Sequence, residues 1–230
     1  MKLDNGLAKK IGFILLFGMV AFVTQRINFS KVIGTENQYF TVFQFFGPIS
    51  GGFLGPAMGS IAVLISQLID FVAFSKQMDL LNFLRLFPML FAAYYFGSRR
   101  KEFGILMPAI AMILFVTNPI AGNAWYYSLY WLIPIIAKLL PDKLFLRSLG
   151  STFTAHAIGS IAWLYTVPMT AEQWASLIPV VAYERILFAI GITVSYIAVN
   201  TLLDAVTKRL NLKYIHIDPR YVAFKGLKLV

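Results

Sequence analysis

The stretch from Ser176 to Thr207, SLIPVVAYERILFAIGITVSYIAVNTLLDAVT, decides the fold class of this chain. Its only charged side chains are those of Glu184, Arg185 and Asp204. A helix that crosses a bilayer needs ~20 mostly apolar residues, and this stretch is longer than that. The sequence therefore predicts a membrane-spanning helix here.

The composition extends this prediction to the whole chain. Of the 230 residues, 59% are hydrophobic and 13% are charged, against roughly 45–50% and about 25% in an ordinary soluble domain. A soluble core of this size cannot hide so many apolar side chains. We expect an all-α, polytopic transmembrane bundle, with one transmembrane domain over residues 1–207 and a short basic cytoplasmic tail over 208–230. Cysteine is absent, which excludes disulfides and thiolate chemistry.

Hydropathy and breaking residues mark eight apolar segments, at residues 8–27, 39–56, 57–75, 80–97, 103–120, 124–140, 148–167 and 176–207. Several are short or interrupted by proline, as at Gly47-Pro48 and Gly55-Pro56, and interrupted segments can form half-spans or re-entrant hairpins. The prediction is a multi-pass protein of the cell membrane with six to eight spans, in which a six-span count is the main rival to eight.

Lysine and arginine in the connecting segments predict the orientation, because cytoplasmic loops hold the excess of both. With the N-terminus inside, only Arg26, Lys31 and Lys76 fall in outer loops. The inner side then receives Lys2, Lys9, Lys10, Arg99, Arg100, Lys101, Lys138, Lys143, Arg147, Lys208, Arg209, Lys213, Arg220, Lys225 and Lys228. Both termini are therefore expected in the cytoplasm. Topology accounts for most of the formal charge of +10, and this dispersed pattern argues against a nucleic-acid partner.

Glycine recurs at every fourth residue through the second and third segments, at Gly47, Gly51, Gly55 and Gly59. Small residues at this spacing let another backbone approach closely, which is how helices associate in lipid. The prolines at 48 and 56 argue against one unbroken helix. We therefore expect a close-packed turn between two spans. Its glycines serve helix packing or, alternatively, expose backbone groups to a substrate as in the broken helices of transporters.

Ionisable residues inside two predicted spans are the strongest candidates for a site. His156 lies in the segment 148–167, and Glu184 is followed directly by Arg185 in the last segment. Charge is expensive inside a membrane, so such groups face a cavity or a partner. From the predicted outer ends, His156 lies ~16 Å deep and Glu184 ~12 Å deep at ~1.5 Å per residue. We expect these two to meet across neighbouring antiparallel helices, either in a pocket or in a structural network.

Helical spacing places His156, Gly159, Ser160 and Trp163 on one face, which predicts one wall of a pocket with Trp163 at its outer edge. Glu184 and Arg185 are adjacent, so they point ~100° apart and cannot both aim at one spot. We expect one of the two to pair across helices while the other lines the cavity.

The outer loops supply further candidates. Glu36 and Asn37, with Gln44 just beyond, can form a lid over an outward-facing pocket, although such loops are also plain connectors. Asn123 lies in a second outer loop and joins the candidate set, with Asn82 and Arg85 as lesser candidates. The aromatic run Trp125, Tyr126, Tyr127, Tyr130 and Trp131 is typical of an interfacial belt.

Catalytic signatures are missing from the sequence, which has no H-E-x-x-H, no G-x-S-x-G and no P-loop. We expect a protein that is not an enzyme and that holds no cofactor or metal. The expected function is binding of a small organic solute for uptake. Two alternatives stay open: a membrane-embedded enzyme with His156 and Glu184 as an acid/base pair, and a scaffold whose glycine face docks another membrane protein.

The stretch FTVFQFFGPISGGFLGPAMG, from Phe40 to Gly59, and the ionisable pair Glu184-Arg185 resemble the substrate-binding membrane subunits (S components) of energy-coupling factor vitamin transporters. The resemblance covers about two-thirds of the chain. It implies a small molecule captured from outside under the loop around Glu36. It also implies a transmembrane coupling subunit and a pair of cytoplasmic ATPases as partners.

Overall fold

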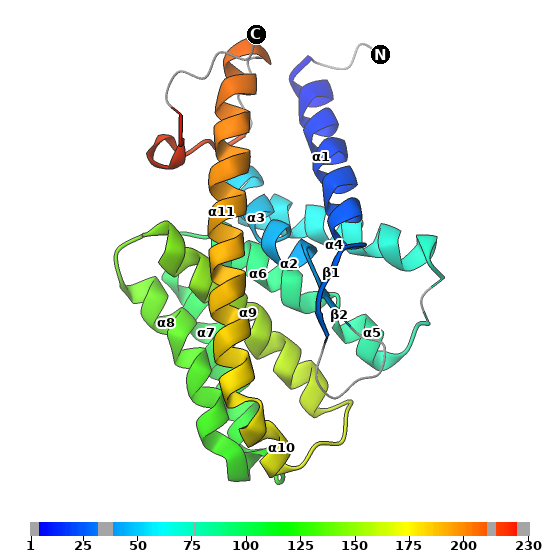
Figure 1. Ribbon diagram of the computed structural model, residues 1–230, viewed down its shortest axis with the longest axis vertical. Helices are drawn as coiled ribbons and strands as arrows, with labels where there is room; N and C mark the ends of the chain where they lie inside the picture. Colours follow the sequence, from blue (N-terminus) through cyan, green and yellow to red (C-terminus); the bar gives the residue numbers. More distant parts are fainter. Residues whose placement is uncertain (1–4, 32–38, 76, 211–214, 225–230) are drawn as a thin grey trace.

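The computed structural model describes residues 5–31, 39–75, 77–210 and 215–224, and it is mostly helical (77%). Helix α11 (Ile178–Leu210) runs along the length of the molecule, and α1 (Asn5–Thr24), which packs against α4 and α2, lies at the height of its upper half (Figure 1). The beginning of α1 and the end of α11 lie at the same end of the molecule.

Helix α9 (Leu144–Leu164) packs against α6, α7, α8 and α11. The bounds of the other helices are α4 (Pro56–Ala73), α5 (Leu80–Leu84), α6 (Phe87–Gly97), α7 (Lys101–Val116), the 3₁₀ helix η1 (Ala121–Trp131), α8 (Leu132–Leu139), α10 (Ala171–Ser176) and the 3₁₀ helix η2 (Pro219–Tyr221). Seven of the eight predicted segments coincide with helices within a few residues at each end. Two of these seven, 80–97 and 124–140, each correspond to two consecutive helices.

The segment 39–56 departs from the prediction, because it is not one helix. Strand β2 (Tyr39–Thr41) pairs antiparallel with β1 (Asn28–Lys31), and two short helices follow, α2 (Phe43–Phe46) and α3 (Ile49–Leu54). Aromatic and β-branched residues (Tyr39, Phe40 and Thr41) favour strand β2, and the two Gly-Pro steps divide the helices. The all-α class therefore holds with one small hairpin added.

Within the described residues, three helical stretches are long and apolar enough to cross a membrane: Pro56–Ala73, Leu80–Gly97 and Ile178–Thr207. The second of these joins α5 and α6. The apolar part of α1, Ile14–Thr24, is shorter. These helices indicate association with a membrane.

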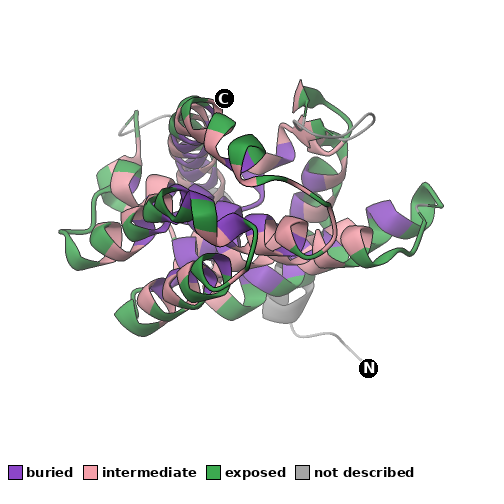
Figure 2. Cartoon of the chain, turned by 90° about the horizontal axis from the view of Figure 1, so that it is seen from below, coloured by how far each residue is buried: buried purple, intermediate pink, exposed green. Residues whose placement is uncertain are grey.

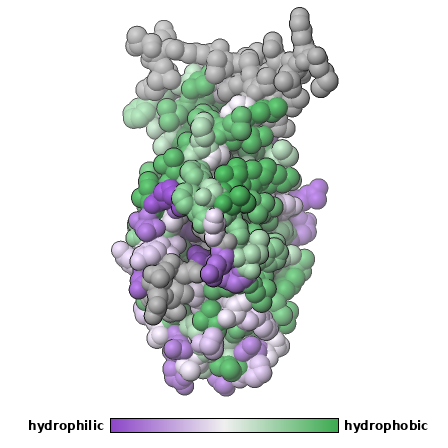
Figure 3. Space-filling model, turned by 90° about the vertical axis from the view of Figure 1, so that its right-hand side faces the viewer, coloured by the Kyte–Doolittle hydropathy of each residue, from purple (hydrophilic) through white to green (hydrophobic). Residues whose placement is uncertain are grey.

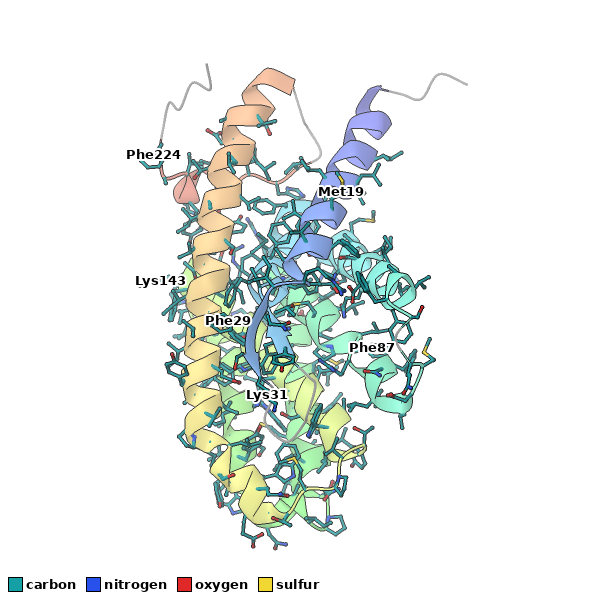
Figure 4. The ribbon with its side chains drawn as sticks, turned by 45° about the vertical axis from the view of Figure 1, so that its right-hand side comes forward. Met19, Phe29, Lys31, Phe87, Lys143 and Phe224 are labelled. Carbon is teal, nitrogen blue, oxygen red and sulfur yellow. The ribbon has the colours of Figure 1, made fainter. Side chains whose placement is uncertain are left out.

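The distribution of side chains also suits a lipid environment. Large apolar side chains point outward, among them Met19 on α1 (Figure 4) and Val72 on α4, which is 77% exposed. Buried residues occupy the centre of the molecule (Figure 2) and include many polar ones, such as Ser50, Thr154 and Asn200. An apolar outside around a partly polar inside is the pattern of a helix bundle whose solvent is lipid.

Glycines allow α3, α4 and α6 to touch backbone to backbone. A Cβ atom at Gly51 would overlap the carbonyl oxygen of Ala93, and one at Gly97 would overlap the backbone of Gly51. A Cβ at Gly59 would come within 2.5 Å of the Gly51 backbone. Gly55 differs, because it turns the chain between α3 and α4 with φ of +81° and has open space around it. Only a glycine adopts this conformation without strain.

The described part of the C-terminal segment, residues 215–224, packs back onto the helices. His216 N–H donates to the carbonyl of Phe53 (2.9 Å), and Ala223 N–H donates to the Thr201 hydroxyl (3.0 Å). Asn200, fully buried in α11, donates to the carbonyls of Asp218 (2.9 Å) and Tyr221 (3.1 Å) and accepts from Asp218 N–H (3.0 Å). The predicted domain boundary at residue 207 lies inside α11, which continues to Leu210.

Asn200→Ala is expected to release this segment. The change leaves the backbone groups of Asp218 and Tyr221 without partners, which costs about 1–3 kcal/mol of stability if they stay buried. The melting temperature should fall, and limited proteolysis should cleave within residues 211–224 faster than in the wild-type protein. Thr207→Ala on the same helix is the control, and equal cleavage of both variants would contradict the assignment.

Candidate functional site

A cavity of about 250 Å³ lies between the β-hairpin, α4, the α5–α6 region, α9 and α11. This volume approaches the lower end of the ~300–1,000 Å³ typical of small-molecule sites. Hydrophilic side chains gather at mid-height on the face shown in Figure 3. The lining residues are Gln25, Tyr39, Phe40, Thr41, Phe43, Gln44, Gln67, Asp70, Phe71, Asn82, Arg85, Leu86, Pro88, Met89, Ala155, His156, Gly159, Ser160, Trp163 and Arg185.

The hairpin is fixed over one side of this cavity by contacts with α11. The Ser30 hydroxyl donates to Glu184 Oε1 (3.2 Å). The rings of Phe29 and Phe40 meet the Phe188 ring edge-on, with centroids 5.8 and 5.3 Å apart. In Figure 4, Phe29 lies between the hairpin and α11, whereas Lys31 is at the hairpin's lower end. The hairpin thus brings Tyr39, Phe40 and Thr41 to the cavity wall.

The imidazole of His156 is buried and held on both ring nitrogens. Trp131 Nε1–H donates to Nδ1 (3.1 Å), and Nε2 lies 2.9 Å from the Tyr127 hydroxyl. Indole nitrogen is only a donor, so Nδ1 must be an acceptor, and a neutral imidazole carries its proton on Nε2. Tyr127 and Trp131 therefore fix the ring orientation of His156 and its tautomer.

The Arg185 guanidinium lines the cavity and is almost fully buried. Its Cζ atom lies over the rings of Phe188 and Phe40, 4.6 and 4.9 Å from the ring centroids. Nη2 lies 3.5 Å from Glu184 Oε2, while Nε has no hydrogen-bond partner among the described residues. The adjacent side chains of Glu184 and Arg185 meet despite their ~100° separation on the helix, because both are long enough to bend toward each other.

The opposite wall of the cavity adds polar groups that the fold leaves unused. Gln67 Oε1 on α4 is buried without a hydrogen-bond partner, which is costly unless a ligand or water supplies one. Arg85, at the end of α5, makes no ion pair within the described part of the chain. Asp70 also lines the cavity, but it is already paired with Arg26. The cavity thus offers arginine donors and an amide acceptor.

The structure separates the predicted site residues into groups. Gln44, His156, Trp163 and Arg185 line the cavity, together with Gly159 and Ser160 of the predicted α9 face. Glu184 does not line it and contacts Ser30 and Arg185. His156 makes its hydrogen bonds to Tyr127 and Trp131, whereas Glu184 makes its own to Ser30 and Arg185, so the hydrogen bonds of the described residues do not join His156 to Glu184 as expected.

Of the three remaining predicted residues, only Asn123 is described, and it does not line the cavity. Asn123 is exposed on η1 and donates to the Pro119 carbonyl (3.3 Å). Glu36 and Asn37 lie outside the described residues. A role in solute binding stays a prediction for each cavity-lining residue.

Sequence reasoning missed the parts of the site that depend on tertiary packing. Tyr127 and Trp131 are buried against His156, whereas the aromatic run was expected to form an interfacial belt. Trp125 and Tyr126 of the same run are exposed, as a belt requires. Gln67 and Asp70 gave a usable signal, because each is a polar residue within an otherwise apolar helix.

Among the described residues, no group of three or more His, Asp or Glu side chains could hold a metal ion. The chain is 24% identical over 204 residues to an uncharacterized protein of Methanocaldococcus jannaschii, and the alignment covers 79% of this chain and 68% of that protein. No family model matches the chain. No solved structure matches it significantly. Function must therefore be argued from the cavity itself.

Proposed function

We propose that this protein binds a small anionic organic solute in the cavity under the β-hairpin and takes part in its uptake across the cell membrane. The observation that carries the proposal is the Arg185 guanidinium, which lines the cavity with Nε unpaired. Arg85 adds a second guanidinium on the opposite side. Arginine forks bind planar carboxylates through paired hydrogen bonds.

The other lining residues favour a solute with an apolar or aromatic body. Phe40, Phe43, Phe71 and Trp163 supply ring surfaces around the same cavity. Aromatic walls with a few placed polar groups are typical of small-molecule sites, and Gln67 Oε1 offers an acceptor for a donor on the solute. The favoured substrate class is an aromatic or short aliphatic carboxylate that fits about 250 Å³.

In this proposal the chain is a multi-pass protein with six to eight crossings and both ends in the cytoplasm. The lysine and arginine distribution supports this orientation. The cavity side with the hairpin then faces outward, as in an S component of an energy-coupling factor transporter. A transmembrane coupling subunit and cytoplasmic ATPases are the proposed partners, since the sequence carries no nucleotide-binding motif of its own.

A screen of matched solutes tests this function. Purified protein in detergent is titrated with nicotinate against nicotinamide and with benzoate against benzamide, and its melting temperature is followed. The two members of each pair differ only in carrying a carboxylate or a neutral carboxamide. The acids are therefore expected to stabilise the protein, and the amides are not. At about 100 times Kd, binding adds ~2.7 kcal/mol to the stability, which raises the melting temperature by several degrees.

The same screen is repeated with the variant Trp163→Ala, which removes an aromatic ring from the edge of the cavity without changing its charge. This variant should weaken binding of the aromatic acids by about tenfold, in line with the worth of an aromatic contact. Tyr183→Ala, which changes an exposed aromatic of α11, should bind like the wild-type protein. Equal stabilisation by acids and amides would remove the anionic assignment, and no stabilisation by any carboxylate would remove the solute site.

A further inference from the structure

A second and larger cavity, of about 960 Å³, lies between the α3–α4 turn, the connections α6–α7 and α8–α9, and the C-terminal segment. No residue lines both this cavity and the one under the hairpin. Lys143, labelled in Figure 4, marks its flank. By the orientation proposed above, it opens toward the cytoplasm.

Basic side chains dominate the wall of this second cavity. It contains six of them, Arg99, Lys101, Lys138, Lys143, Arg147 and Arg220, and two carboxylates, Asp142 and Asp218. Arg220 engages both carboxylates, with Nη2 lying 2.8 Å from Asp218 Oδ2 and 3.2 Å from Asp142 Oδ2. Hydrogen bonds from the Arg220 side chain hold the pKa of Asp218 below its usual value, so this carboxylate stays ionised and bound to Arg220. The basic side chains of the wall still outnumber its carboxylates six to two, which leaves the cavity positively charged.

Arg147 is the most informative of these cations. Its guanidinium is stacked over Phe96 (4.8 Å) and Tyr196 (5.2 Å), and its Nε and Nη2 atoms are buried without hydrogen-bond partners among the described residues. Nε lies 3.7 Å from Asp142 Oδ1, which is too far for a hydrogen bond. Lys138 donates to the carbonyl of Tyr95 (3.0 Å) and to that of Ser98, and it makes no ion pair within the described part of the chain.

Three long helices begin at the same cavity. Gly55 and Pro56 start α4, Lys101 starts α7, and Lys143 precedes α9, and all four residues line the cavity. None of the three helices has a side-chain hydrogen bond at its N-cap. The first N–H groups of a helix and its dipole favour negative charge. These helix ends therefore add to the positive field of the side chains.

We infer that this cavity binds a phosphate-bearing anion. A phosphate has several acceptor oxygens and up to two charges, which suits a guanidinium whose Nε and Nη2 atoms lack hydrogen-bond partners among the described residues and which has further cations around it. The same group occurs on anionic lipid headgroups and on soluble phosphate compounds, and the cavity volume accommodates either. The site is independent of the solute site, so the two proposals stand or fall separately.

The experiment compares two probes in melting measurements on the purified full chain. Pyrophosphate, against chloride at matched ionic strength, represents the soluble source. Phosphatidylglycerol in phosphatidylcholine nanodiscs, against phosphatidylcholine alone, represents the lipid source. The variants are Arg99→Gln and Lys143→Gln, which change exposed side chains at the rim, and Arg147→Gln with its partial rescue Arg147→Lys. Lys31→Gln, on the hairpin, removes one positive charge outside the cavity.

We expect one of the two probes to raise the melting temperature of the wild-type protein and of Lys31→Gln. Arg147→Gln should weaken binding of that probe about tenfold, as loss of a charge-assisted hydrogen bond implies, and the rim variants should weaken it less. Stabilisation by pyrophosphate identifies a soluble ligand, and stabilisation by phosphatidylglycerol alone identifies a lipid. Failure of both probes, or equal shifts in the rim variants and in the wild-type protein, overturns the inference.

Discussion

Gly51→Val is expected to prevent this protein from reaching its native fold. Gly51 lies where α3 crosses α6, and even a single Cβ atom would overlap the carbonyl oxygen of Ala93. The obstacle is the backbone of Ala93 and Gly97 in α6, so no rotamer change relieves it, and α3 must separate from α6. Overpacking commonly costs about 1–3 kcal/mol. We expect at least ~3 kcal/mol for Gly51→Ala and loss of folded protein for valine.

The measurement is the yield of monodisperse protein after detergent extraction, followed by the melting temperature of whatever is recovered. Gly12→Ala and Gly18→Ala on α1 are matched controls, because nothing lies within 4 Å of a Cβ at either position. Alanine is the better helix former, so these controls should be as stable as the wild-type protein or slightly more so. If Gly51→Ala melts together with the controls, the close contact between α3 and α6 is absent from the native protein.

Much of the helical frame was predictable, because the lipid environment imposes a simple rule of length and hydropathy. The segment 176–207 could be assigned from its apolar length, and α11 covers all of it except the first two residues. Helical spacing likewise placed His156 and Trp163 on one face, and both line the cavity. Both predictions use local properties of the sequence, because residues three or four apart lie on the same face of a helix.

What could not be predicted depends on contacts between distant segments. The strands β1 and β2 are short and pair across a loop, and no period in the sequence distinguishes them from the end of a helix. The partners of His156 come from η1, 25 and 29 residues earlier in the chain. Arg85 and Gln67 stand out in the sequence as polar residues in apolar segments, but their place in one cavity with residues of α9 and α11 is a tertiary arrangement that hydropathy does not encode.

Arg185→Gln should have the largest effect on solute binding. The guanidinium is buried among Phe40, Phe188 and Glu184, and its Nε is the unpaired donor of the cavity. Removing one partner of a desolvated, charge-assisted interaction costs about 2–5 kcal/mol. We therefore expect the affinity for the carboxylate identified in the screen to fall about 100-fold. Arg185→Lys keeps the charge without the planar fork, so it should lose roughly tenfold.

The same change also threatens folding, because it leaves the buried Glu184 carboxylate with Ser30 as its only hydrogen-bond donor among the described residues. An uncompensated buried charge commonly costs about 3–5 kcal/mol. The double variant Glu184→Gln/Arg185→Gln removes this charge as well, so it should recover much of the melting temperature but none of the affinity. Lys31→Gln controls for the loss of one positive charge. If the double variant binds the carboxylate as tightly as the wild-type protein, Arg185 does not contact the solute. The affinity lost in Arg185→Gln would then come from its lower stability, and Arg185 would serve packing alone.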